Sequence, residues 1–183
     1  QRTNGDAKWY FTPVTISPNT TYTFSDFYKS NVASNVTVQV ITASGATSYI
    51  WLGNPVAASQ WTSFSKSFTT PANAAKVTVF HILDKVGTLE TDAYGLYSGI
   101  ITPTPIPSST PTPSIAPTPI PTVIMTPTPT PVATNFIPNP SLETVAGNIP
   151  QGWLNNKWGT NTAIFTYLTT GHSGSRSIKT ELT

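Results

Sequence analysis

Histidines and acidic side chains, which most often carry acid–base chemistry, are few and scattered in this sequence. There are only two histidines, and the local pattern places His81 in a strand and His172 in a Gly-Ser loop. The seven acidic residues contain no pair whose spacing indicates an acid–base partnership. No nucleophile motif surrounds any serine. We therefore expect His81 to be a packed strand residue, and the sequence predicts that the protein is not an enzyme.

Composition narrows the possible partners. The 183 residues contain no cysteine, so disulfides, zinc–thiolate sites and thiol nucleophiles are excluded. Only 9% of residues are charged and the net charge is +2, which predicts neither nucleic acid nor an anionic membrane as a partner. No stretch reaches the roughly 18 apolar residues of a membrane span. Low charge with many Thr, Ser and Asn is typical of secreted proteins, and we expect an extracellular or cell-surface location.

Residues 1–101 show the alternation of strands throughout. The segments 22–28 (YTFSDFY) and 36–40 (VTVQV) alternate apolar and polar side chains, whereas 76–83 (KVTVFHIL) is almost continuously apolar. The continuous run suits a central strand with both faces covered. Turn residues lie between the strands, and no segment has a helical period. This spacing of short strands predicts an all-β sandwich.

Residues 102–134 form a Pro/Thr-rich linker. Prolines recur from Pro103 to Pro131, mostly beside threonine, and such a run favours polyproline II and acts as a semi-rigid spacer. Val123, Ile124 and Met125 interrupt it with an apolar cluster. Two interpretations stay open for this cluster: ordinary linker residues, or a segment that docks on a surface or adds to a sheet edge.

Residues 135–183 return to strand patterns, notably in 163–167 and 177–182. This segment has too little apolar material to fold alone. If the end of the chain is joined to its beginning, residues 176–183, a polar turn at 1–6 and residues 7–11 form a β-hairpin that has been cut open. We expect head-to-tail assembly in which each part supplies strands that the other lacks. The alternative is a truncated chain with one ragged end.

Several motifs resemble a known family. Residues 135–143 (NFIPNPSLE), 150–153 (PQGW) and 171–177 (GHSGSRS) resemble the opening of carbohydrate-binding modules of the family four and nine type. Those modules are jelly-roll β-sandwiches related to galactose-binding domains. Residues 14–24 are similar to the middle of the family pattern, and residues 87–92 (GTLETD) to its closing strand. The motifs therefore occur here in the order middle, closing, linker, opening.

The resemblance and this permuted order together imply a jelly-roll β-sandwich assembled from two segments. Residues 135–183 would complete a neighbouring copy or fold back on residues 1–101 of the same chain. The first function this predicts is a structural subunit or repeat of an extracellular filament or surface array, assembled head-to-tail by strand complementation. The alternative is a carbohydrate-binding module of a secreted multidomain protein. The residues expected to make assembly contacts are Trp9, Tyr10, Phe11, Ile178, Leu182, Val123, Ile124 and Met125.

The resemblance also implies that exposed aromatic side chains bind polysaccharide, since the apolar face of a sugar ring stacks on a flat aromatic ring. The candidates are Trp51, Trp158, Tyr49 and Trp9. Packing at the rim or between subunits is the alternative role for Trp51 and Trp158. Trp153, which follows Pro-x-Gly, corresponds to a core aromatic of the family.

Calcium is the cofactor that the resemblance implies. The family often holds a structural calcium ion with carboxylate and carbonyl oxygens, and Glu143 and Asp92 occupy the corresponding positions. A calcium ion there would join the two segments. The family's closing motif usually has a second acidic residue after the first, whereas this sequence has Ala93 at that position.

Overall fold

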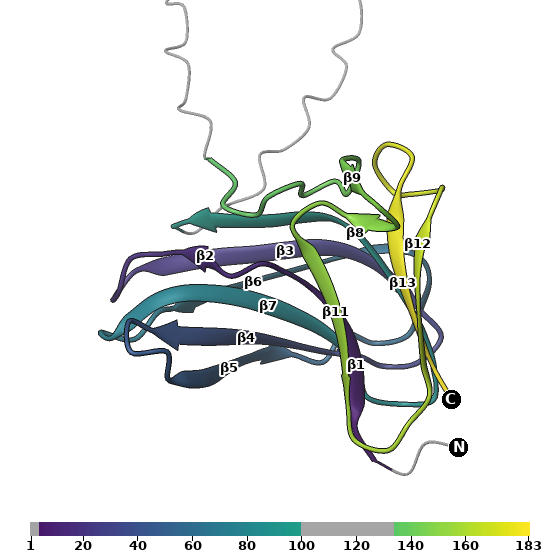
Figure 1. Cartoon of the computed structure of the whole chain (residues 1–183), viewed down its shortest axis with the longest axis horizontal. Coiled ribbons are helices and arrows are strands. Elements are labelled where there is room, and N and C mark those ends of the chain that lie inside the picture. The colour runs from purple at the N-terminus through teal and green to yellow at the C-terminus, as the bar shows by residue number, and fades with distance from the viewer. Residues whose placement is uncertain (1–3, 100–133) are drawn as a thin grey trace, which may run out of the picture.

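Alternating apolar and polar residues build two antiparallel sheets that pack face to face. The computed structural model describes residues 4–99 and 134–183. Sheet A has the strand order β11-β1-β7-β4-β5, with β2 added to β7, and sheet B has the order β12-β13-β8-β3-β6. A separate small hairpin pairs β9 with β10. The described residues contain no helix. Figure 1 shows β1 and β11 running steeply across the direction of β7, β4 and β5.

The strand bounds follow the alternating segments of the sequence. Sheet A consists of β1 (Asp6–Phe11), β2 (Val14–Thr15), β4 (Asn35–Thr42), β5 (Thr47–Gly53), β7 (Ala74–Leu83) and β11 (Trp153–Trp158). Sheet B consists of β3 (Thr21–Ser30), β6 (Ala58–Thr69), β8 (Gly87–Ser98), β12 (Ala163–Leu168) and β13 (Ser177–Leu182). The hairpin strands are β9 (Val145–Ala146) and β10 (Ile149–Pro150).

The core lies between the sheets and follows directly from the period of two in each strand. In β4, Val36, Val38 and Val40 are fully buried, while the residues between them face outward. Trp153 is 2% exposed and packs against the rings of Phe11 and Tyr94. Its indole N–H donates to the carbonyls of Pro138 and Asn139. The core position expected for Trp153 is confirmed.

Both segments of the chain contribute strands to both sheets. In sheet A, β11 pairs with β1 from Phe11↔Trp153 to Asp6↔Trp158. In sheet B, β13 pairs with β8 between Leu182↔Gly87 and Ile178↔Thr91. The expected fold, a β-sandwich assembled from two segments, is thus confirmed, and here the second segment completes the first within one chain.

The expected hairpin between the end and the beginning of the chain is wrong. β13 lies in sheet B between β12 and β8, whereas β1 lies in sheet A between β11 and β7. Alternation fixes which face of a strand is buried but not which strand lies beside it. The two ends nevertheless meet at one loop: Asn4 N–H donates to the carbonyl of Thr160, and Thr183 exchanges two backbone hydrogen bonds with Thr162.

The linker lies outside the described residues, and so does its apolar cluster of Val123, Ile124 and Met125. Within the described ranges, the chain forms no helix that is long and apolar enough to cross a membrane.

Candidate functional site

The outward face of sheet A carries a groove of about 460 Å³. Residues from all five strands of the sheet path contribute to it, because outward side chains at matched register positions lie on one face. Its lining consists of Asp6, Lys8, Tyr10, Thr37, Gln39, Tyr49, Phe80, Ile82, Asn156, Lys157 and Trp158. We call this surface the sheet A groove.

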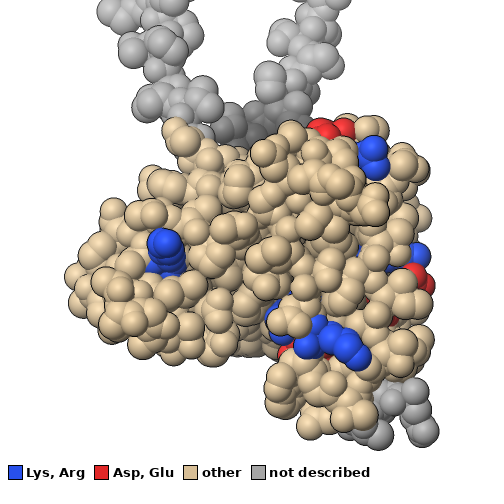
Figure 2. Space-filling view, viewed as in Figure 1, with Lys and Arg blue, Asp and Glu red and all other residues tan. Residues whose placement is uncertain are grey.

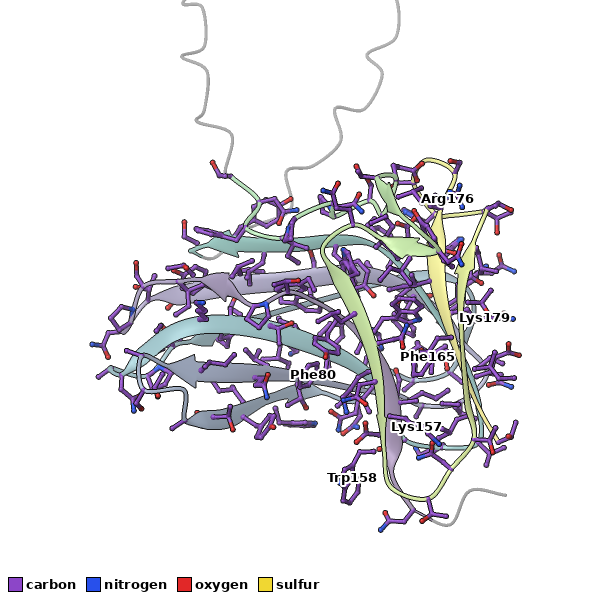
Figure 3. The ribbon with its side chains drawn as sticks, viewed as in Figure 1. Phe80, Lys157, Trp158, Phe165, Arg176 and Lys179 are labelled. Atoms are coloured by element: carbon purple, nitrogen blue, oxygen red, sulfur yellow. The ribbon has the colours of Figure 1, made fainter. Side chains whose placement is uncertain are left out.

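Two aromatic side chains stand at opposite sides of the sheet A groove. Tyr49, on the edge strand β5, is 61% exposed, and Trp158, at the end of β11, is 62% exposed. Figure 3 shows Trp158 projecting away from the sandwich. Single exposed aromatics are common on protein surfaces, but two on one hollowed face, each with a free ring surface, form platforms on which apolar ligand faces can stack.

The middle of the groove contains a packed aromatic pair. The rings of Tyr10 and Phe80 meet edge to face, with centroids 5.3 Å apart and an interplanar angle of 86°. Phe80 is only 7% exposed, and the Lys8 ammonium lies 5.3 Å from the centroid of its ring. Tyr10 and Phe80 therefore make a rigid floor between the two exposed rings.

Polar groups surround these rings. The Gln39 side-chain amide donates to the Tyr49 hydroxyl over 3.2 Å, which fixes the direction of that phenol. The Thr37 hydroxyl donates to the Asn35 side-chain carbonyl over 2.7 Å. A site with flat aromatic rings, amides and hydroxyls suits a ligand that alternates apolar faces with hydroxyl groups.

The turn after β11 fixes the place of Trp158. The Asn161 side-chain amide donates to the Trp158 carbonyl over 2.8 Å. Gly5 packs on the same carbonyl with a φ of +111°, and a Cβ on Gly5 would lie 1.8 Å from that oxygen. Only glycine allows this approach of backbone to backbone. Gly159, next to Trp158, has a φ of +84° and packs against Asn4 and Gly5 in the same way.

The structure brings three of the four predicted sugar-stacking residues to one face. Tyr49 and Trp158 line the sheet A groove. Trp51 is 62% exposed and lies on the same face of β5, two residues from Tyr49, although it does not line the groove itself. Trp9 needs correction: it faces the core, is 4% exposed, and donates its indole N–H to the Lys179 carbonyl. Its phase in β1, with Ala7 and Phe11, makes it a core residue.

Of the five predicted assembly residues that lie in the described part of the chain, four, including Trp9, are buried within the chain itself. Phe11 and Ile178 are fully buried, and Leu182 is 1% exposed. Tyr10 instead faces outward into the sheet A groove. Phe80 and Gln39 were not anticipated. Their outward phase in β7 and β4 could be read from the sequence, but their proximity to Tyr10 and Tyr49 depends on the pairing of distant strands.

Glu143 and Asp92 both hold the loop that contains His172. Asp92 is fully buried and accepts N–H groups from Ala93, His172 and Ser173 over 2.6, 2.7 and 2.8 Å. Burial raises the pKa of the Asp92 carboxyl, and the three backbone donors oppose that rise. Glu143 accepts the backbone N–H and the hydroxyl of Ser175.

This arrangement does not present the two carboxylates as bare ligands for calcium. The carboxylate oxygens of Asp92 and Glu143 accept hydrogen bonds from N–H and O–H groups, and a cation would have to replace these donors. Within residues 4–99 and 134–183, no group of three or more acidic, histidine or cysteine side chains is placed to hold a metal ion. Calcium at these two carboxylates therefore stays a prediction.

A serine, a histidine and an aspartate do form a hydrogen-bonded row, but inside the core. The Ser34 hydroxyl lies 2.8 Å from His81 Nε2, and His81 Nδ1 lies 2.6 Å from Asp26 Oδ2. All three residues are at most 3% exposed. This spacing resembles that of a nucleophilic triad, but a substrate cannot reach a serine buried to this degree. The row instead ties β7 of sheet A to β3 of sheet B.

The outward face of sheet B has a second hollow, of about 440 Å³, which is lined by Lys29, Ser30, Asn31, Ala57, Ala58, Ser59, Thr88, Glu90 and Lys179. Its charges are mutually paired: Lys29 with Glu90 at 3.1 Å, and Lys179 with the neighbouring Glu181 at 3.0 Å. Trp61 lies beside it, with the Lys29 ammonium 4.4 Å from its ring centroid. No aromatic side chain lines this hollow, which distinguishes it from the sheet A groove.

Comparisons with known proteins give distant structural neighbours. No family model matches the chain, and no curated protein matches it. One similar structure contains the N-terminal CBM22-1 and GH10 modules of endo-1,4-beta-D-xylanase 10B from Clostridium thermocellum, complexed with xylohexaose. Its identity is 18% and its TM-score 0.38, over 44% of this chain and 17% of that one.

Two further neighbours are carbohydrate-binding modules. The CBM22-1 xylan-binding domain of Paenibacillus barcinonensis Xyn10C has 13% identity and a TM-score of 0.37, over 45% of this chain and 58% of that one. The apo CBM of PbXyn10C has 16% identity and a TM-score of 0.46, over 100% of this chain and 92% of that one. The chain thus spans less than two thirds of the first two structures. The neighbours are carbohydrate-binding modules, the broad class that the sequence motifs resemble, although the first two are CBM22 modules and not of the family four and nine type.

Proposed function

We propose that this chain is a non-catalytic carbohydrate-binding module that holds a polysaccharide in the sheet A groove. The observation that carries the proposal is the pair of exposed rings, Tyr49 and Trp158, at the two sides of one hollow with an aromatic floor and polar lining. Sugar rings offer an apolar face for the aromatics and equatorial hydroxyls for amide and hydroxyl partners. A chain of such rings, lying across the strands, meets both exposed aromatics at once.

Removal of the exposed rings tests this proposal. Affinity gel electrophoresis with a panel of soluble polysaccharides identifies the ligand, and xylan, which one neighbour's name states as its ligand, is the first probe. Trp158→Ala and Tyr49→Ala should each weaken binding about tenfold, the loss of one stacked ring. Trp61→Ala, on the opposite sheet, is the matched control and should bind like the unaltered chain. Equal losses in all three variants would refute the groove as the site.

Secretion belongs to the same proposal. A polysaccharide ligand and a low content of charged residues fit a module that works outside the cell. Figure 2 shows that Lys, Arg, Asp and Glu occupy only isolated spots on the face in view. Fractionation of the source cells, with detection of this chain in the medium or on the surface, is the direct test.

We further propose that copies of this chain assemble by exchanging their second segments, residues 135–183. The specific observation is that Trp153, Ile178 and Leu182 of the second segment fill a core built mainly by the first. The same contacts can be made by the second segment of a neighbouring copy, which would give head-to-tail polymers. Light scattering after size-exclusion chromatography at rising concentration tests this. A single monomer mass at every concentration, with no polymer by electron microscopy, excludes assembly by exchange.

A further inference from the structure

The charged side chains in the sheet A groove influence which class of polysaccharide the groove binds. Three of its lining residues are charged: Asp6, Lys8 and Lys157. The Lys157 ammonium donates to the backbone carbonyl of Asn161 over 2.6 Å, in the turn after β11. Asp6 and Lys8 lie two residues apart on the outward face of β1 and form a close ion pair. This pair lies between the positions of Trp158 and Ile82, since Asp6 is paired with Trp158 and Lys8 with Ile82.

The Asp6–Lys8 pair is partly withdrawn from water. The Lys8 side chain is 13% exposed and that of Asp6 is 23% exposed. Lys8 also lies over the Phe80 ring, which is part of the groove floor. A sugar ring that covers this floor removes further water from the pair. Charges interact more strongly where water is excluded, so the sign of a ligand charge matters more here than on an open surface.

We propose that the Asp6–Lys8 pair makes the groove selective for uncharged polysaccharides. Each charge is neutralised by the other, so the pair offers hydrogen bonds to sugar hydroxyls without a net attraction for either ion. A sugar carboxylate or ammonium brought onto the floor loses water, and the neutralised pair gives it no net attraction in return. This uncompensated loss of hydration disfavours ionic polymers relative to neutral ones, which is selectivity by exclusion. This inference rests on the proposed polysaccharide site and adds the class of sugar that it takes.

Two reciprocal variants test the selectivity. Asp6→Asn keeps the size of the side chain and an oxygen that Lys8 can donate to, but leaves the ammonium unneutralised. It should gain about tenfold in affinity for carboxylated polymers at low ionic strength, and most of the gain should vanish near 1 M salt. Lys8→Gln leaves the Asp6 carboxylate unneutralised and should shift binding toward a cationic polymer. Loss of folding would weaken the binding of every polymer, so it cannot produce opposite shifts in polymer preference in the two variants.

The neutral and carboxylated probes are two matched pairs, each with a common backbone. Arabinoxylan and hydroxyethylcellulose serve as neutral probes, glucuronoxylan and carboxymethylcellulose as carboxylated ones, and chitosan as the cationic one, all by affinity gel electrophoresis. Glu90→Gln is the matched control, because it removes the same charge from a similar ion pair with Lys29 on the outward face of sheet B. Lys157→Gln, combined with Asp6→Asn, should leave the gain for carboxylated polymers in place. Thermal midpoints confirm that each variant is folded.

The possible results separate this inference from the proposed function. Unaltered protein that binds neutral polymers, with the two opposite shifts in the variants, supports both. Unaltered protein that binds neutral polymers, with no gain for carboxylated ones in Asp6→Asn or an equal gain in Glu90→Gln, overturns the selectivity and leaves the site standing. Unaltered protein that prefers carboxylated polymers also overturns the selectivity. Failure to bind any polymer in the panel overturns the proposed function and this inference with it.

Discussion

Individual buried polar residues connect the two sheets, and His81 is the clearest case. It faces Asp26 of sheet B and Ser34 of the loop before β4, and the rings of Tyr28 and Phe64 lie around it. The second carboxylate oxygen of Asp26 is buried and accepts no hydrogen bond from the described residues. Asp26 therefore depends on His81 as its partner, because a buried charge without a partner is strongly destabilising.

Replacing His81 alone should lower the free energy of unfolding more than replacing both His81 and Asp26. We expect His81→Leu to lower the free energy of unfolding by about 3–5 kcal/mol, because it leaves the Asp26 carboxylate buried and unpaired. Changing both residues to Leu removes the unpaired charge and should cost less than the single change. Urea denaturation of both variants measures this. A double variant less stable than His81→Leu would show that the pair does not act as described.

Tyr94 gives a pH dependence whose sign follows from its burial. Its pKa is raised well above the ordinary value, first by burial and then by the nearby charge of Asp26. The folded state therefore keeps a proton that the unfolded state releases near pH 10, so this contribution to stability is full below about pH 10. It is lost as the pH rises through the folded-state pKa. Tyr94→Phe should flatten the loss of stability above pH 10, as measured by urea denaturation. An unchanged slope would contradict this assignment.

Among the elements, the turn between β11 and β12 decides where Trp158 stands. Gly5, just before β1, packs against this turn, and Gly5→Ala would place a Cβ against the Trp158 carbonyl in a positive-φ conformation. We therefore expect a loss of about 1–3 kcal/mol in stability. We also expect weaker polysaccharide binding, because Trp158 would be displaced. Gly45→Ala is the matched control: its φ is +86°, but a Cβ there meets no atom within 4 Å. Unfolding and binding measurements on both variants separate the steric effect from the backbone strain. Equal losses of binding would show that the turn does not position Trp158.

The loop from Gly171 to Ser175 is the element on which calcium can be tested. Asp92 and Glu143 hold this loop through N–H donors, and the stacked rings of His172 and Phe27, with centroids 3.7 Å apart, fix its middle. If calcium binds to the two carboxylates, a chelator should lower the thermal midpoint of the unaltered chain. It should not lower the midpoint of Glu143→Gln, which lacks one of the ligands. An unchanged midpoint on chelation removes calcium from the account.

For the whole molecule, the strand segments were predictable and their pairing was not. The continuous apolar run at 76–83 became β7, the central strand of sheet A, and 177–182 became β13. Period-two alternation carries that information. It does not determine which strands lie side by side. For this reason the expected pairing of the two ends of the chain is wrong. The aromatic type of Trp9 suggests a surface platform for a sugar ring, but its phase in β1 places it in the core.

In the proposed binding face, too, single residues were predictable from the sequence and their arrangement was not. Tyr49, Trp51 and Trp158 could be selected as exposed aromatics because polar residues and turns surround them in the sequence. Their common face, the Tyr10–Phe80 floor and the Asp6–Lys8 pair depend on five strands brought together from both segments. Contacts between residues about 150 positions apart, such as Asp6 with Trp158, cannot be derived from local pattern.

If polysaccharide binds on the outward face of sheet A, as proposed, the indole N–H signals of the five tryptophans in a ¹H–¹⁵N spectrum will report where it lies. On titration with xylohexaose, or with an oligosaccharide of whichever polymer the protein retains, the Trp158 signal should shift together with backbone amides of β1, β4 and β7. The signals of buried Trp9 and Trp153 and of Trp61 on sheet B should stay in place. Shifts confined to Trp61 and sheet B would instead place the ligand on the opposite sheet and rule out the sheet A groove as its site.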